Sequence, residues 1–142
     1  MRRFFQLLLI ILLLPLITGM GSQGGTPSDK IPVPAKKFTA IFIDQMDITT
    51  ECREVSIEGA TFLEGKKGEG TFSVAFENIQ TVVFRLNEGK LYGLIKLRDG
   101  GTMELLLNKE RKAYGRTKYG TFQIRLHDLK KIMMGQADQK KG

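Results

Sequence analysis

The chain has 142 residues, of which 42% are hydrophobic and 26% are charged, and its formal net charge is +7. Its single cysteine, Cys52, excludes an intramolecular disulfide, a CxxC pair and a CxxCH haem site. One cysteine and one histidine also give zinc too few of the ligands that it prefers.

The first predicted element is an export signal over residues 1–21. Two arginines precede an apolar run from Leu7 to Ile17, and small residues follow up to Ser22. This order is typical of a secretory signal peptide that is cut before Ser22. An uncleaved anchor is the alternative, because the apolar stretch from Phe4 to Met20 lies at the lower edge of the length that spans a bilayer. We therefore expect the protein in the periplasm or at the cell surface, and at a membrane only if the segment is not removed.

The rest of the chain divides by composition into three parts. Residues 22–37 hold three of the four prolines, which predicts a linker that buries little apolar surface. Residues 38–134 are long enough for one domain with its own core. Residues 135–142 are predicted to form a disordered basic tail.

The domain is predicted to be all-β. Short runs of Val, Ile, Phe and Thr alternate with Gly, Asn and Asp, and no stretch has the period of a helix longer than a turn or two. Asn87-Glu88-Gly89 and Asp99-Gly100-Gly101 are hairpin turns, since glycine accepts a positive φ. Strands are expected near residues 38–44, 49–57, 60–64, 70–76, 80–86, 90–98, 102–108, 112–116, 120–126 and 129–134.

An internal repeat joins two parts of this domain. EGKKGEGTFSVAFENIQTVVF at residues 64–84 matches YGRTKYGTFQIRLHDLKKIMM at residues 114–134 with a fixed offset of 50. Phe72 and Phe122 are then expected at equivalent buried positions, and a one-turn corner is expected near Asn78 and Asp128. Because one such unit buries little apolar surface alone, we expect two duplicated antiparallel β units to share one core.

The ending GRTKYGTFQIRLHDLKKI resembles an element of uncharacterised exported bacterial proteins. In these proteins a Gly-rich hairpin precedes an F-G-x-x-x-I-x-L-x-x-I-x-x-I pattern within small SH3-like or Sm-like β units. The resemblance covers roughly residues 38–134. It implies a small β barrel or sandwich of unknown role, and it carries over no catalytic or ligand residues.

No catalytic residue, metal site or cofactor is predicted. His127, the single histidine, points away from the apolar face of its strand, and an exposed structural role is expected. Alternation from Val55 and Ile57 places Cys52 on the opposite, polar face, so its thiol is expected to be accessible. An accessible single cysteine in an exported chain suggests a homodimer linked through Cys52.

Charge is distributed unevenly along the chain. Residues 38–84 carry 3 basic and 8 acidic residues, whereas residues 85–142 carry 14 basic and 6 acidic residues. Such asymmetry indicates either a polyanionic partner or two parts that attract each other. The candidate anion-binding residues are five cations interleaved with Tyr114 and Tyr119, namely Lys109, Arg111, Lys112, Arg116 and Lys118. The alternative for this segment is a basic hairpin rim whose tyrosines pack on neighbours.

These patterns predict a non-enzymatic exported envelope protein that acts as an interaction or structural β module. The alternative is a binding domain for an anionic envelope ligand, either a lipid head group or a polysaccharide, and an enzyme comes third. The expected partner is an envelope protein or an anionic surface, and nucleic acid is not expected because the chain is exported.

Overall fold

The computed structural model describes residues 30–137, and this part of the chain is almost entirely antiparallel β-sheet. The predicted signal or anchor at residues 1–21 and residues 138–142 lie outside the described part. Within residues 30–137, no helix has the length and apolar character needed to cross a membrane. The all-β prediction is confirmed. The strands are β1 (Phe38–Asp44), β2 (Thr49–Ile57), β3 (Phe62–Lys67), β4 (Gly70–Ala75), β5 (Ile79–Asn87), β6 (Lys90–Leu97), β7 (Thr102–Leu107), β8 (Lys112–Thr117), β9 (Gly120–Arg125) and β10 (Leu129–Ala137).

The predicted strands and turns agree with the observed ones to within a few residues. The corners predicted near Asn78 and Asp128 are single 3-10 turns, η2 (Phe76–Asn78) and η3 (Leu126–Asp128). The glycines of the two predicted hairpin turns, Gly89 and Gly100, both have a positive φ. These features were predictable because turn residues and two-residue alternation act locally.

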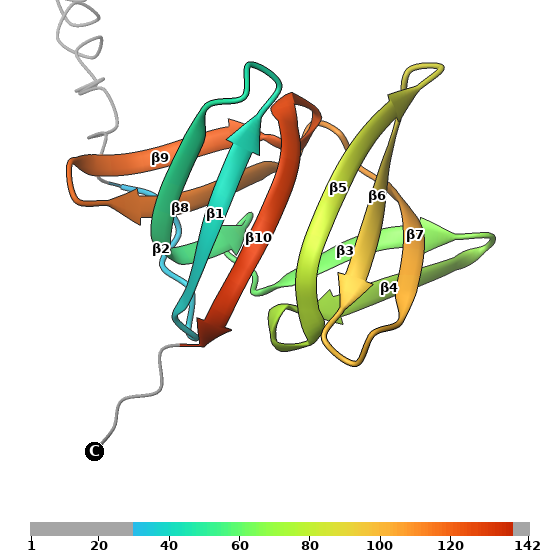
Figure 1. Ribbon diagram of the computed structural model, residues 1–142, viewed down its shortest axis with the longest axis horizontal. Helices are drawn as coiled ribbons and strands as arrows, with labels where there is room; N and C mark the ends of the chain where they lie inside the picture. Colours follow the sequence, from blue (N-terminus) through green and yellow to red (C-terminus); the bar gives the residue numbers. More distant parts are fainter. Residues whose placement is uncertain (1–29, 138–142) are drawn as a thin grey trace, which may run out of the picture.

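The ten strands form one curled sheet in the order β4-β3-β7-β6-β5-β10-β1-β2-β8-β9. Figure 1 shows two halves, β4-β3-β7-β6-β5 and β10-β1-β2-β8-β9, each with a hairpin that lies across its longer strands. The halves meet where β10 pairs with β5, through Lys131–Val83, Ile132–Val82 and Met133–Thr81. The second half therefore combines the first two strands of the domain with its last three.

The segments that match at an offset of 50 form the same kinds of element. Strands β3, β4 and β5 and the turn η2 have the same lengths as β8, β9, β10 and η3, and each boundary is shifted by 50 residues. After both corners the chain turns back into the core, where Ile79, Val82, Leu129 and Ile132 are all buried.

A single hydrophobic core runs through both halves. Its members come from β1, β2, β8 and β10 as well as from β3–β7. Phe38 of β1 and Phe76 of η2 pack edge to face with ring centroids 5.6 Å apart, so an aromatic pair joins the halves. Burial of apolar side chains from both halves in one cluster makes each half depend on the other.

The prediction that Phe72 and Phe122 are equally buried is wrong for Phe72. Phe122 is half-buried and stacks on Phe42, with ring centroids 5.6 Å apart. Phe72 remains 42% exposed on the edge strand β4, opposite Gly65, which has no side chain to cover it. The difference arises because the second half places an aromatic side chain of β1 beneath its phenylalanine.

The ends of the domain also differ from their predicted boundaries. The first residues of the tail expected from residue 135 belong instead to β10, which continues to Ala137 and pairs there with Phe38 of β1. Part of the predicted linker contacts the domain. Pro34 is buried, and Lys36 forms an ion pair with Glu77 at 2.6 Å.

Candidate functional site

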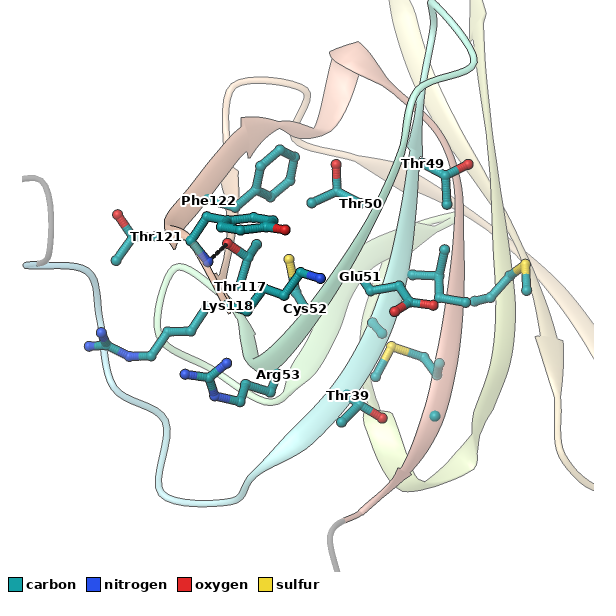
Figure 2. A pocket seen from close by; sticks show the side chains of 17 residues that line it. Thr39, Thr49, Thr50, Glu51, Cys52, Arg53, Thr117, Lys118, Thr121 and Phe122 are labelled. Carbon is teal, nitrogen blue, oxygen red and sulfur yellow. Dashed lines mark hydrogen bonds between the residues drawn. The ribbon is translucent and has the colours of Figure 1, made fainter.

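An open groove of about 970 Å³ lies in the second half of the sheet. It lies between the β8–β9 hairpin and the strands β1, β2 and β10. In Figure 2 the hairpin carries Thr117, Lys118, Thr121 and Phe122 on one side, with Cys52 in the middle and Thr39, Thr49 and Glu51 on the other side.

Three kinds of side chain line this groove. The apolar contribution comes from Ala40, Ile41, Cys52, Phe122, Met133 and Met134. Hydroxyl groups come from Thr39, Thr49, Thr50, Thr117 and Thr121. Among the charged lining residues, Glu51 is the single acid against three cations, Arg53, Arg116 and Lys118. The groove therefore combines an apolar surface, hydrogen-bonding groups and a net positive charge, which is the usual composition of a ligand site.

The prediction that Cys52 is accessible is wrong, because a β-bulge interrupts the alternation of β2. The register between β2 and β8 shifts between Arg53 and Ser56, and Glu54 within this segment has a φ of 51°. The extra residue turns Cys52 to the same side as Val55 and Ile57, and the cysteine is 5% exposed. The prediction of a homodimer linked through Cys52 rested on an accessible thiol, and this thiol is instead part of the core.

Cys52 is expected to react slowly with thiol reagents in the folded protein. Burial raises the pKa of Cys52 from 9.0 to about 11. The thiolate is the reactive form, so at mildly alkaline pH its fraction falls by about a hundredfold before any shielding is counted. Reaction with Ellman's reagent should therefore be far slower in native buffer than in urea, and equal rates would show that the thiol is exposed.

Two arginines face each other across the strands that form the groove. Arg53 of β2 is the register partner of Arg116 of β8, and like charges in directly opposite positions destabilise a sheet. Glu54 offsets part of this repulsion, with an Oε2 atom 3.0 Å from Nε of Arg116 and an Oε1 atom 3.5 Å from Nζ of Lys37. Arg53 is exposed and has no ion-pair partner within residues 30–137.

The tip of the β8–β9 hairpin presents an aromatic ring at the groove. Thr117 organises the turn, since its hydroxyl donates to the Gly120 carbonyl oxygen at 2.9 Å and accepts from the Tyr119 N–H at 3.1 Å. Tyr119 is 87% exposed, and the Lys118 ammonium lies 4.9 Å from its ring centroid. A turn that is fixed in this way holds an aromatic face and a cation beside each other.

The five predicted cations do not form one site. Arg116 and Lys118 line the groove, whereas Lys112 is the first residue of β8, at its other end, and Lys109 and Arg111 precede that strand. Nζ of Lys109 donates to the Gly89 carbonyl oxygen at 3.1 Å, and Arg111 lies 3.8 Å from Glu64. Lys112 and Arg116 are four positions apart on β8, which corresponds to roughly 13 Å of extended strand, so the two groups of cations lie apart.

The charge asymmetry along the chain largely disappears in the fold. Residues 38–59 and 110–135, which build the second half, hold eight Lys and Arg residues and seven Asp and Glu residues. Residues 60–109 hold seven and six, respectively. The acidic β1–β2 segment pairs with the basic C-terminal strands, as the Arg116–Glu54 and Lys130–Asp47 ion pairs illustrate. The balance supports attraction within the chain, and it leaves the positive charge of the groove as a local feature.

The other candidate groups lie apart from this groove. His127 is half-buried in η3, with Nδ1 3.1 Å from Oδ1 of Asp128, and it is not among the lining residues. Within residues 30–137, no three His, Cys, Asp or Glu side chains are close enough to hold a metal ion.

Sequence reasoning missed Arg53 and Glu51, which come from the acidic part of the chain. A signal was nevertheless present in β2. Strict alternation from Val55 and Ile57 places the charged Arg53 in the core and Cys52, a residue type that is usually buried, in solvent. Such a double conflict indicates a bulge between positions 53 and 55.

A family model described as "Uncharacterised protein" matches residues 34–137. No curated protein matches the chain, and no solved structure matches it either.

Proposed function

The chain belongs to the family of uncharacterised proteins whose model matches residues 34–137, and we propose that it is a non-enzymatic, exported module of the cell envelope that binds a partner in its groove. The observation that carries this proposal is the pair Arg53 and Arg116, which stand opposite each other beside Lys118 in a groove of about 970 Å³. Two like charges in opposite positions destabilise the free protein, and contact of both arginines with a ligand explains their placement.

The location in the envelope rests on the amino-terminal sequence. Arg2 and Arg3 precede the apolar run, and small residues follow it. Export also agrees with a chain that has one cysteine, since this thiol is buried and needs no partner. The interaction role rests on the groove, where hydroxyl and cationic groups surround an apolar floor.

The test is to fractionate cells that make the full chain and to follow the exported protein. Mass spectrometry should find a protein that begins near Ser22, and this protein should sediment with envelope fragments at low salt and be released at high salt. Lys118→Glu should weaken this retention. Lys67→Glu is the matched control, because Lys67 is an exposed cation of the other hairpin, which does not line the groove.

Two outcomes would contradict the proposed function. An intact Met1 in a soluble cytoplasmic fraction would remove the export step. Equal retention of the Lys118 and Lys67 variants would show that the groove does not contribute to binding.

We infer in addition that the two halves of the sheet are copies of one small SH3-like or Sm-like unit. The strand orders β4-β3-β7-β6-β5 and β9-β8-β2-β1-β10 support this inference, as do the matched hairpins and 3-10 turns. Gly65 and Gly115 occupy matching positions, and each lies against a core side chain of the neighbouring strand, Leu105 and Cys52 respectively. In this interpretation β1 and β2 complete the copy that holds the groove.

A further inference from the structure

We propose that the groove binds an acidic polysaccharide, which is a chain of sugar rings that bear carboxylate, sulfate or phosphate groups. This inference rests on the proposed function and names its ligand class. Three features of the groove support it, and each matches a different part of such a chain.

The first feature is the cationic cluster of Arg53, Arg116 and Lys118. Glu54 holds Arg116 in place, with its Oε2 atom 3.0 Å from Nε of the arginine. Arg53 lies opposite Arg116 without an ion-pair partner within residues 30–137. Two arginines in register on neighbouring strands offer guanidinium N–H donors to anionic groups, and such charge-assisted hydrogen bonds are among the stronger polar contacts.

The second feature is the aromatic ring of Tyr119. Tyr119 is 87% exposed, its backbone N–H donates to Thr117 in the turn, and the Lys118 ammonium lies 4.9 Å from its ring centroid. The C–H face of a sugar ring packs on an aromatic face, and the neighbouring hydroxyl and acid groups then point outward. A cation beside the ring is positioned to meet an acid group of the same sugar or of the next one.

The third feature is the hydroxyl lining. Five threonines line the groove together with Glu51, whose carboxylate can accept hydrogen bonds from sugar hydroxyls. A membrane surface would be matched by apolar side chains around the rim, which enter the bilayer beside the cations. Here Ala40 and Cys52 are buried, and the other apolar lining residues, Ile41, Phe122, Met133 and Met134, are half-buried, so none of them projects freely from the groove.

The test is a binding titration of the exported protein with polygalacturonate and heparin, with neutral dextran and with vesicles of phosphatidylcholine and phosphatidylglycerol. An acidic polysaccharide should bind, and its affinity should fall steeply with salt as counterions are released. Arg53→Glu should weaken binding about tenfold or more, since a charge-assisted contact is replaced by a repulsion. Lys96→Glu should bind like the wild type, because Lys96 is exposed on β6 and carries the same charge change outside the groove.

Two variants of Tyr119 separate a sugar from a simple anion. Tyr119→Ala should lose about tenfold in affinity for the polysaccharide at unchanged net charge, whereas Tyr119→Phe should keep it because the ring remains. Both variants should fold normally, since the side chain is almost fully exposed.

Several results would overturn this proposal. Preferential binding to the anionic vesicles would show that the ligand is a lipid surface instead. Equal affinities of Tyr119→Ala and Tyr119→Phe for the polysaccharide would show that the groove binds anions without recognising the sugar. If neither polysaccharide binds but retention on envelope fragments still depends on Lys118, the acidic polysaccharide is excluded while the envelope-binding function stands. Loss of both kinds of binding would remove the proposed function as well.

Discussion

Phe38→Ala is expected to lower the free energy of unfolding by about 4 kcal/mol, the usual loss for a fully buried phenylalanine. Phe38 is 1% exposed and packs edge to face on Phe76, which belongs to the other half of the sheet. The substitution leaves a cavity at the contact between the halves, and the surrounding strands cannot collapse fully into it. Urea denaturation followed by circular dichroism measures the change.

Phe72→Ala is the matched control for this experiment. Phe72 is 42% exposed on an edge strand, so its removal should cost less than about 1 kcal/mol. Equal losses for Phe38 and Phe72 would contradict the described core. If the Phe38 variant unfolds in two separate transitions, the contact between Phe38 and Phe76 is what makes the two halves unfold together.

Gly115→Ala is expected to destabilise the protein by about 3 kcal/mol, the upper range of ordinary overpacking. A Cβ atom at this position would lie 2.5 Å from Cβ and 2.9 Å from Sγ of Cys52, and 3.3 Å from Val55. These atoms belong to the buried strand β2, so the β8–β9 hairpin would have to move away from it. The same movement should expose the Cys52 thiol, and labelling by Ellman's reagent should become faster.

Gly70→Ala provides the comparison, because it makes the same chemical change in the first hairpin. The nearest atom to a Cβ there is the Lys67 carbonyl oxygen at 3.7 Å, an ordinary contact. Alanine at such a position is neutral or stabilises by about 0.5 kcal/mol through the unfolded state. A Gly115 variant as stable as the Gly70 variant would show that β2 and β8 are not closely packed.

Much of the local structure could be predicted from the sequence. Strand boundaries, turns and the corners after β4 and β9 depend on neighbouring residues, such as the alternation around Val74 and the glycines that end each strand. The register of β2 could not be extrapolated in the same way, because the bulge at Glu54 shifts every side chain before it to the other face. Cys52, which was placed in solvent by alternation, is therefore buried, and Arg53 is exposed at the groove.

The candidate site was predicted only in part. Arg116 and Lys118 were identified from the basic segment, but they meet Arg53 and Glu51 only because β2 pairs with β8. The other three predicted cations are adjacent in sequence to the site and lie away from it in space. Distance along a strand increases by about 3.3 Å per residue, so cations that are close in sequence are spread along β8 and do not form one surface patch.

By itself, the sequence determined the all-β class, the order of strands and turns, and the matching segments fifty residues apart, since alternation and turn chemistry are short-range effects. Only the tertiary structure decided that the first two strands pair with the last three, from β1–β10 and β2–β8 contacts across more than fifty residues of chain. Such pairings depend on how apolar faces from distant segments fit into one core, and no local pattern specifies that choice. The pairing of the first two strands with the last three produces the groove, its opposed arginines and the balance of charge between the halves.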